Sequence, residues 1–270
     1  MPPTEQAPRA RLRVTLLQLA VEDAAPERNL TRAEALLRGA PPADLFLLPE
    51  LWTTGYAHAA WPAAARASTP RVLEALTALA RELGGAIGGS LVAPGAGERL
   101  VNRFYLIRPD GTSETYDKTH LFAPMGEDRH LARGTRRAIA GAGPFRAGLS
   151  LCYDLRFPEM YRLDALDGAD LFLVASAWPA SRVETMRLLA RARAVENQAF
   201  LVLCNRAGTG ADGTVFGGHS AVIGPDGDAI HEAGADEATV SALLDRDRVT
   251  TARATLLVFA QRRGGVDWRA

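Results

Sequence analysis

The sequence predicts an α/β fold in which short strands and amphipathic helices follow one another along the chain. Short apolar runs alternate with amphipathic stretches over the whole of the 270 residues, which is the pattern of layered α/β proteins. Hydrophobic residues make up 47% of the chain and charged residues 23%, and this ordinary globular composition excludes a disordered or fibrous protein. A chain of this length buries roughly 70–75% of its unfolded surface, so its core needs no metal or disulfide.

The predicted strands are short apolar segments bounded by polar or turn-forming residues. The phrase Ala43–Leu47 recurs as Ala169–Leu173, which we interpret as two buried strands that both follow helices. A short strand, Glu114–Tyr116, is expected after the turn at Gly111-Thr112. The other predicted strands, in chain order, are Arg13–Leu19, Asp44–Leu48, Ala86–Val92, Arg103–Ile107, Phe145–Leu151, Asp170–Ala175, Phe200–Leu203, Ser220–Ile223 and Ala238–Leu243.

Helices are predicted where amphipathic stretches separate these strands. Three of them begin with a proline, Pro26, Pro70 or Pro158, and proline is well tolerated in the first turn of a helix. A period of 3.6 residues is plainest over residues 186–199. The predicted helices are Pro26–Arg38, Pro70–Leu83, Pro158–Leu166, Val183–Gln198 and Arg246–Ala254.

Residues 1–270 are expected to form a single domain, because the interior contains no linker, charge block or low-complexity segment. The two ends, about residues 1–12 and 262–270, are expected to be loose or dependent on a partner. The segment 124–133 is a candidate lid, and the sequence leaves open whether it closes over a site.

The charge balance bears on the possible partners. The chain has 31 basic and 31 acidic residues and a net charge of zero, so it lacks the basic surface that nucleic-acid binding usually needs and gives no reason to expect attraction to an anionic membrane. No stretch approaches the roughly 18 apolar residues of a membrane span, and no signal peptide is recognisable. We therefore expect a cytoplasmic protein whose two cysteines, Cys152 and Cys204, are reduced.

Lys118 is the only lysine, so the other 30 of the 31 basic residues are arginines. An ammonium is a compact point charge that a planar guanidinium does not replace at a tight site. Lys118 is therefore the first candidate for a functional residue.

Reactive side chains follow the predicted strands, where ligands bind in open α/β sheets. Glu50 follows one strand, Cys152 another, and Lys118 follows the short strand after the turn. A thiol nucleophile, a carboxylate base and an ammonium partner for an oxyanion form a plausible acyl-transfer set. Glu50, Lys118 and Cys152 each also have a structural interpretation; a buried cysteine, for example, usually acts as a small hydrophobe. For the other cysteine, Cys204, the structural interpretation is preferred.

Motifs for other chemistry are missing from the sequence. There is no Cys-x-x-Cys, His-Glu-x-x-His or Walker loop, and no Gly-x-Ser-x-Gly that would anchor a serine triad. His120 and His130 are too isolated to be assigned as metal ligands. No cofactor and no metal are expected.

Several separated motifs resemble those of the nitrilase superfamily of carbon–nitrogen hydrolases. The likeness extends from about Arg13 to Phe259, in the order of the family. Its motifs are Leu47-Leu48-Pro49-Glu50, Tyr116–Phe122 around Lys118, Leu151–Glu159 around Cys152, Arg191–Gln198, and Gly218-His219-Ser220 followed by Pro225-Asp226-Gly227.

The resemblance implies a four-layer α-β-β-α sandwich and a Glu-Lys-Cys triad. Glu50 would be the general base, Lys118 would stabilise the tetrahedral oxyanion, and Cys152 would be the nucleophile that carries a thioester. Glu127 fits the place of a second, supporting glutamate of the family. The backbone N–H of Tyr153 is the candidate second oxyanion donor.

Within the superfamily the segments 152–156, 176–182 and 204–206 look most like bacterial omega-amidases, which hydrolyse 2-oxoglutaramate and related monoamides. Trp178 is then a candidate wall of a small apolar slot, and Arg206 or Arg182 a candidate partner of the remote carboxylate, with a structural role as the alternative for Arg206. Arg156 and Glu159 are expected to form a structural ion pair. The resemblance also implies a homodimer or higher homo-oligomer.

Other functions stay open at this point. One is a different amidase specificity, for carbamoyl amino acids, deaminated glutathione or aliphatic amides, and another is nitrile hydrolysis by the same triad. A hypothesis from a different class is a non-catalytic thiol or interaction protein, in which replacing Glu50 would change nothing.

Overall fold

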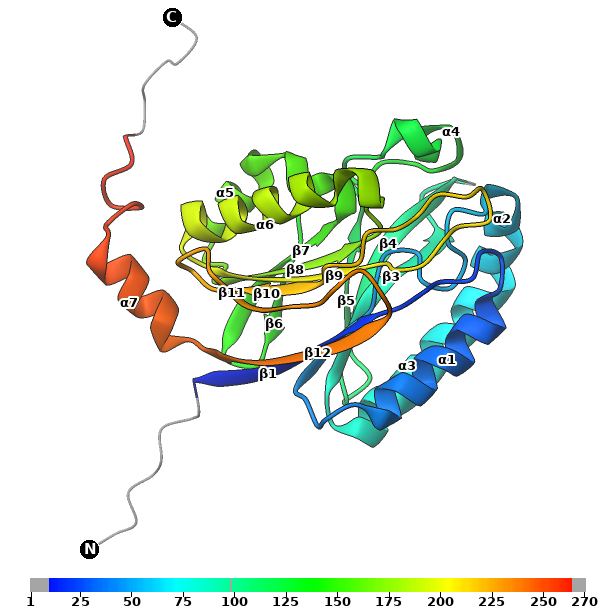
Figure 1. Ribbon diagram of the computed structural model, residues 1–270, viewed down its shortest axis with the longest axis horizontal. Coiled ribbons are helices and arrows are strands. Elements are labelled where there is room, and N and C mark those ends of the chain that lie inside the picture. The colour runs from blue at the N-terminus through cyan, green and yellow to red at the C-terminus, as the bar shows by residue number, and fades with distance from the viewer. Residues whose placement is uncertain (1–9, 98, 264–270) are drawn as a thin grey trace, which may run out of the picture.

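Two six-stranded sheets pack face to face, and helices cover the outer face of each sheet (Figure 1). The computed structural model describes residues 10–97 and 99–263. Its layers run from helices α5 and α6 through the two sheets to helices α1 and α3. The expected four-layer α-β-β-α sandwich is therefore confirmed.

The first sheet is built mainly from the first half of the chain and has the strand order β12-β1-β2-β3-β4-β5. Strands β1, β2 and β3 are parallel, while β4, β5 and β12 pair antiparallel with their neighbours. The strands are β1 Arg11–Gln18, β2 Leu45–Leu47, β3 Ala86–Pro94, β4 Leu100–Ile107, β5 Ser113–Asp117 and β12 Ala238–Asp245. The outer helices are α1, Pro26–Gly39, and α3, Thr69–Leu83.

The second sheet repeats this plan with the order β11-β10-β9-β8-β7-β6. Strands β7, β8 and β9 are parallel and are connected through α5, Pro158–Leu166, and α6, Val183–Asn197. The strands are β6 Ile139–Ala142, β7 Phe145–Leu151, β8 Leu171–Ser176, β9 Phe200–Asn205, β10 Ala221–Ile223 and β11 Ala229–Glu232. The remaining helices are α2 Trp61–Ala63, α4 Glu127–His130 and α7 Asp247–Thr255.

Alternation along a strand divides its side chains between two apolar layers. Leu45 and Leu47 of β2 pack in the core that the two sheets share, whereas Phe46 packs against α3 in the outer layer. Successive strand residues point to opposite faces, so a strand buried on both sides needs apolar residues at every position. This explains the continuous apolar runs by which the strands were predicted.

The predicted helices and strands are all present, with ends that shift by a few residues. Two strands, β6 and β11, were not predicted, because both are short edge strands and the exposed pattern of β11 lacks an apolar run. The helices α2 and α4 were also missed, being too short for a helical period. No helix among the described residues has the length and apolarity to cross a membrane.

The N-terminal boundary of the fold differs from the expectation. Arg11 and Leu12 belong to β1, and Leu12 is buried in the shared core. The rest of the predicted loose N-terminal end, residues 1–9, and residues 264–270 of the C-terminal end lie outside the described residues. The tail before residue 264 packs on its own chain, where the Phe259 ring lies 5.0 Å from the Arg253 guanidinium.

Candidate active site

The carboxyl ends of β2, β7 and β8 meet at one edge where the two sheets face each other, and they are followed by Glu50, Cys152 and Trp178. The carbonyl of Ser176, the last residue of β8, accepts hydrogen bonds from the backbone N–H of Glu50 at 3.3 Å and of Arg206 at 3.0 Å. This carbonyl ties the first sheet to the second beside the site. Leu51 and Cys152 both have a positive φ, 46° and 47°, and such strain in non-glycine residues is often found at active sites.

Lys118 lies between two carboxylates in the interior of the protein. Its Nζ atom is 2.7 Å from Oε1 of Glu50 and 2.6 Å from Oε2 of Glu127, and none of the three side chains is exposed. A lysine ammonium has three N–H donors. Among the described residues two of them have acceptors, which leaves the third for another acceptor.

Hydrogen bonds to neighbouring segments hold Lys118 and Glu127 in position. The backbone N–H of Lys118 donates to Asn102 at 2.9 Å, and its carbonyl accepts from Gly134 at 2.8 Å. A side chain at Gly134 would collide with the carbonyl oxygen of Asp117, so glycine is required there. The backbone N–H of Phe122 donates to Oε2 of Glu127 at 2.7 Å, which places the inner side of segment 124–133 in the site.

Two further residues contact the carboxylates and were not predicted from the sequence. Asn102, on β4, donates through Nδ2 to Glu50 at 2.8 Å and to Glu127 at 3.1 Å. The hydroxyl of Tyr56 donates to Oε2 of Glu50 at 3.0 Å. Asn102 lies just before the predicted strand Arg103–Ile107 and joins it only in the structure, where β4 begins at Leu100. Tyr56 lies in a loop that has no periodic pattern.

Burial and these charges determine the protonation of the site. Burial alone would lower the pKa of Lys118, but the charges of Glu127 and Glu50 outweigh it and raise this pKa above its usual value. Burial raises the pKa of Glu127, an effect that the charge of Lys118 opposes and that of Glu50 reinforces. The pKa of Cys152 is raised well above its usual value, first by burial and then by the charge of Glu50. Cys152 is therefore a thiol at rest and needs a base to become a nucleophile.

A hydrogen-bonded turn fixes Cys152 at the end of β7. The buried carboxylate of Asp154 accepts hydrogen bonds from the N–H of Leu151 at 3.0 Å, from the hydroxyl of Tyr116 at 2.8 Å and from the N–H of His120 at 3.0 Å. These bonds join the turn over residues 152–156 to the segment that carries Lys118. Tyr153 lies in this turn, directly after Cys152.

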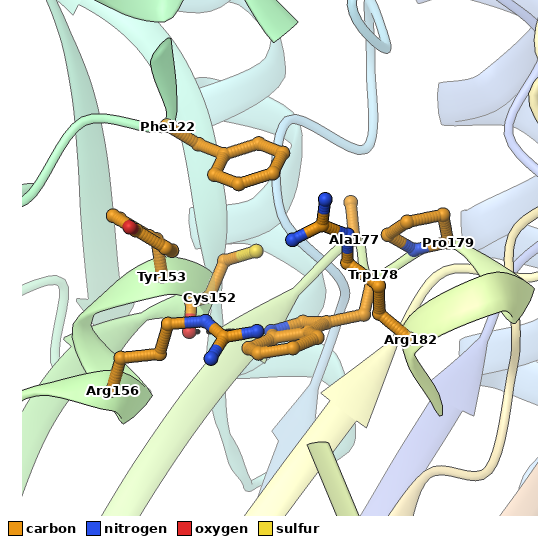
Figure 2. Close-up of a pocket in the computed structure, with 8 residues that line it drawn as sticks. All are labelled: Phe122, Cys152, Tyr153, Arg156, Ala177, Trp178, Pro179 and Arg182. Atoms are coloured by element: carbon orange, nitrogen blue, oxygen red, sulfur yellow. Dashed lines mark hydrogen bonds between the residues drawn. The ribbon is translucent and has the colours of Figure 1, made fainter. Parts of the chain in front are cut away.

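A small pocket opens over Cys152, and Figure 2 shows its sulfur pointing into it. Trp178 forms one wall: its backbone N–H donates to Oδ1 of Asn205 at 2.7 Å, and its indole N–H donates to the carbonyl of Cys152 at 3.3 Å. The lining residues are Phe122, Cys152, Tyr153, Arg156, Ala177, Trp178, Pro179 and Arg182.

Two arginines extend into this pocket from opposite sides of the view in Figure 2. The guanidinium of Arg182 lies 5.8 Å from the centre of the Phe122 ring, and that of Arg156 lies 4.9 Å from the Trp178 ring. The expected ion pair between Arg156 and Glu159 is not among the ion pairs of the described residues, so that expectation was wrong.

Arg206 lies outside the pocket, which contradicts its prediction as a partner of the substrate carboxylate. Its guanidinium is completely buried, 2.8 Å from Oδ1 of Asp23 and 3.9 Å from the centre of the Phe216 ring. It also donates to the carbonyl of Val21 at 2.8 Å. These contacts are those of a structural residue, the alternative that the sequence left open for Arg206.

Cys204 is also part of the structure rather than of the site, with its sulfur 3.3 Å from the carbonyl of Leu17 in the core. In the part of the chain from residue 10 to 263, residue 98 excepted, no group of three or more His, Cys, Asp or Glu side chains is placed to hold a metal ion.

The fold holds a buried cluster of charged side chains beside Cys152, and comparison with known proteins gives the family of the chain. The model of the carbon–nitrogen hydrolase family matches residues 13–254. The chain therefore belongs to this family, as its motifs indicated, and it is a hydrolase that acts on amides.

Similar proteins include omega-amidase YafV of Escherichia coli K12, 39% identical over 84% of this chain and 87% of that protein. The 2-oxoglutaramate amidase of Paenarthrobacter nicotinovorans is 35% identical over 90% of this chain and 86% of its own length. The crystal structure of XC1258 from Xanthomonas campestris, a CN-hydrolase superfamily protein with an arsenic adduct in its active site, aligns with a TM-score of 0.89 at 31% identity and covers 95% of this chain and 99% of that one.

Proposed function

We propose that this chain hydrolyses the terminal amide of a short dicarboxylate monoamide, with 2-oxoglutaramate as the model substrate, through a thioester on Cys152 and with release of ammonia. The observation that carries the proposal is a buried Glu50–Lys118–Glu127 cluster beside a thiol whose pocket holds two arginines. The cluster supports acyl transfer, and the arginines support an anionic substrate. The names of the similar amidases agree with both parts.

In the first half of the reaction the proton of the Cys152 thiol passes to Glu50 while sulfur attacks the amide carbon. The oxyanion that forms accepts hydrogen bonds from the third N–H of Lys118 and from the backbone N–H of Tyr153. Glu50 then gives its proton to the nitrogen, the C–N bond breaks, and ammonia leaves. Glu127 stays paired with the Lys118 ammonium during the reaction, which keeps Lys118 charged and in position.

In the second half a water molecule replaces ammonia. Glu50 takes a proton from the water, which attacks the thioester carbon. The second oxyanion accepts hydrogen bonds from the same two donors, Lys118 and the backbone N–H of Tyr153. The C–S bond breaks, the thiol recovers its proton, and the dicarboxylate departs. One carboxylate thus acts alternately as base and acid, which a site closed to bulk water favours.

The remote carboxylate of the substrate is assigned to Arg156 and Arg182. Both guanidinium groups enter the pocket that contains the nucleophile, and guanidinium matches a carboxylate through paired N–H donors. Trp178 and Phe122 are the apolar walls against which the short carbon chain lies.

The test compares two amides in variants of these arginines. Arg156→Ala and Arg182→Ala are expected to raise KM for 2-oxoglutaramate at least tenfold, by about 1.4 kcal/mol or more each, and to leave hydrolysis of an uncharged aliphatic amide unaffected. Arg71→Ala, which changes an exposed arginine of α3, is the matched control. An unchanged KM in both variants would refute the carboxylate assignment, and wild-type preference for the uncharged amide would assign a different specificity.

The proposal also covers the domain organisation of the chain, its oligomeric state and its cellular compartment. We treat residues 1–270 as one catalytic domain that forms a homodimer or higher homo-oligomer, since Leu163, Leu166 and Leu188 of α5 and α6 are exposed on one helical layer. Both cysteines are free and the mechanism needs a reduced Cys152, which suits a cytoplasmic protein. Light scattering of the purified protein tests the assembly.

A further inference from the structure

The two oxygens of the Glu50 carboxylate have different surroundings. Oε1 accepts hydrogen bonds from Lys118 at 2.7 Å and from Asn102 at 2.8 Å. Oε2 accepts one hydrogen bond, from the hydroxyl of Tyr56 at 3.0 Å. Each carboxylate oxygen has two lone pairs. Donors among the described residues therefore engage both lone pairs of Oε1 and one lone pair of Oε2.

We propose that Oε2 of Glu50 is the atom that takes the proton from Cys152, and that Tyr56 is the positioning residue that holds this oxygen toward the sulfur. This inference rests on the proposed role of Glu50 as the base. It adds an assignment at the level of single atoms: Oε1 binds the ammonium, and Oε2 carries the proton.

The proton balance follows this assignment. When the thiol is deprotonated, the S–H bond breaks and an Oε2–H bond forms. When ammonia leaves, the Oε2–H bond breaks and an N–H bond forms on the departing nitrogen. Tyr56 keeps its own proton through both steps, so it acts through Glu50.

Tyr56 is suited to this task because its hydroxyl stays protonated. Burial first, and then the charges of Glu127 and Glu50, raise the pKa of this phenol well above its usual value. A neutral phenol beside a carboxylate donates its hydrogen bond to the carboxylate. That bond favours the ionised form of Glu50, which is the form that accepts the proton.

The surroundings of Tyr56 hold its ring in place. The ring packs against Trp61, with 6.2 Å between ring centres, and the indole N–H of Trp61 donates to the carbonyl of Gly55 at 3.0 Å. Gly55 has a φ of 55°, and a side chain there would collide with Asp23 and with the guanidinium of Arg206. The buried Arg206–Asp23 ion pair thus packs against the loop that carries Tyr56.

The test is Tyr56→Phe, with Tyr161→Phe as the matched control. Tyr161 is also buried and its hydroxyl is bonded to Ser150 at 2.8 Å, so the control removes an equivalent hydroxyl outside the site. Ammonia release is measured from pH 4.5 to 9 with any amide that the wild type hydrolyses. The rate of Cys152 alkylation by iodoacetamide, followed by intact mass, reports the thiol without a substrate.

In Tyr56→Phe, we expect kcat/KM to fall about ten- to hundredfold, the effect of losing one hydrogen bond to a charged group. The acidic limb of both pH profiles should move up by about one pH unit, because a donor that favoured the ionised carboxylate is gone. Tyr161→Phe should leave both limbs where they are. Fluorotyrosine at position 56 keeps the hydroxyl as a stronger donor and should move the limb down.

A uniform loss of activity at all pH values, or a Tyr56→Phe profile equal to that of the wild type, would overturn the assignment of Tyr56. Glu50→Gln separates this failure from a failure of the proposed function. If Glu50→Gln is inactive and Tyr56→Phe behaves as the wild type, only the role of Tyr56 is refuted. If Glu50→Gln keeps its activity, the base itself is wrongly assigned and both proposals fail.

Discussion

Replacing Lys118 by methionine tests both the stability and the chemistry of the site. Methionine has nearly the length of lysine and no charge, so the cavity stays filled while Glu50 and Glu127 lose the ammonium that lies 2.7 and 2.6 Å from them. Removing one partner of a buried ion pair costs about 3–5 kcal/mol of stability. Losing a donor to the oxyanion costs about 3–4 kcal/mol in the barrier, a fall in kcat of about a hundred- to a thousandfold.

The loss of stability in Lys118→Met should depend on pH. Without the ammonium the two buried carboxylates repel each other, and one of them retains a proton in the folded state that the unfolded chain has released. A group whose pKa is raised by folding loses its stabilising contribution as the pH rises. The destabilisation should therefore be larger at pH 8 than at pH 5.

The assay combines urea denaturation at both pH values with ammonia release, and a second variant separates the two effects. In Lys118→Met/Glu127→Gln one carboxylate is neutral, so much of the lost stability should return while activity stays low. Lys118→Arg keeps the charge but brings a larger planar group into a fully buried site, and it should remain inactive. Recovery of activity in the double variant, or a destabilisation that is the same at both pH values, would refute this account of Lys118.

Three further predictions concern the buried residues Arg206, Asp154 and Asp164. Arg206→Met should lose about 3–5 kcal/mol of stability in urea because Asp23 is left unpaired, with KM for the amide unchanged; a selective rise in KM would return Arg206 to the substrate site. Asp154→Asn should cost about 1.5–3 kcal/mol and most of the activity, because the amide turns an N–H toward groups that donate to Asp154; a fully active, equally stable variant would contradict its role in the Cys152 turn. Burial raises the pKa of Asp164 to about 6, against the opposing effect of Arg137, so the folded state holds a proton that the unfolded chain releases near pH 4. Wild-type stability should accordingly fall relative to Asp164→Asn between pH 4 and pH 7, by up to about 3 kcal/mol, and a constant difference in urea titrations would contradict this.

The predictable part of the site consists of side chains that follow strands. Glu50 and Cys152 each follow an apolar run at the carboxyl end of a parallel strand, where ligands bind in α/β sheets. Their strands, β2 and β7, belong to different sheets, so it is the face-to-face packing of the two sheets that brings these side chains together. Lys118 stood out as the single lysine of the chain. The motif around it also gave the place of Glu127, which the structure puts against the ammonium.

The remaining residues depend on contacts that no local pattern encodes. Tyr56 reaches Glu50 from an irregular loop, and Asn102 reaches two carboxylates from within a strand. Arg156 turns toward Trp178 rather than Glu159 because the turn after Cys152 presents it to the pocket. Arg206 follows a strand, as the site residues do, yet it meets Asp23, a residue from the opposite end of the chain. A position directly after a strand therefore indicates a candidate site residue. The burial of its side chain and its hydrogen-bond or ion-pair partners show whether it belongs to the site.

The most direct test of the central claim is ammonia release from 2-oxoglutaramate by the wild type and by Cys152→Ala, with binding followed by thermal shift. Alanine removes the sulfur and leaves Glu50, Lys118 and both pocket arginines in place. The account predicts rapid release by the wild type, and a Cys152→Ala protein that is still stabilised by the amide but releases no ammonia. Release by Cys152→Ala at the wild-type rate would contradict a thioester on Cys152 and with it the mechanism.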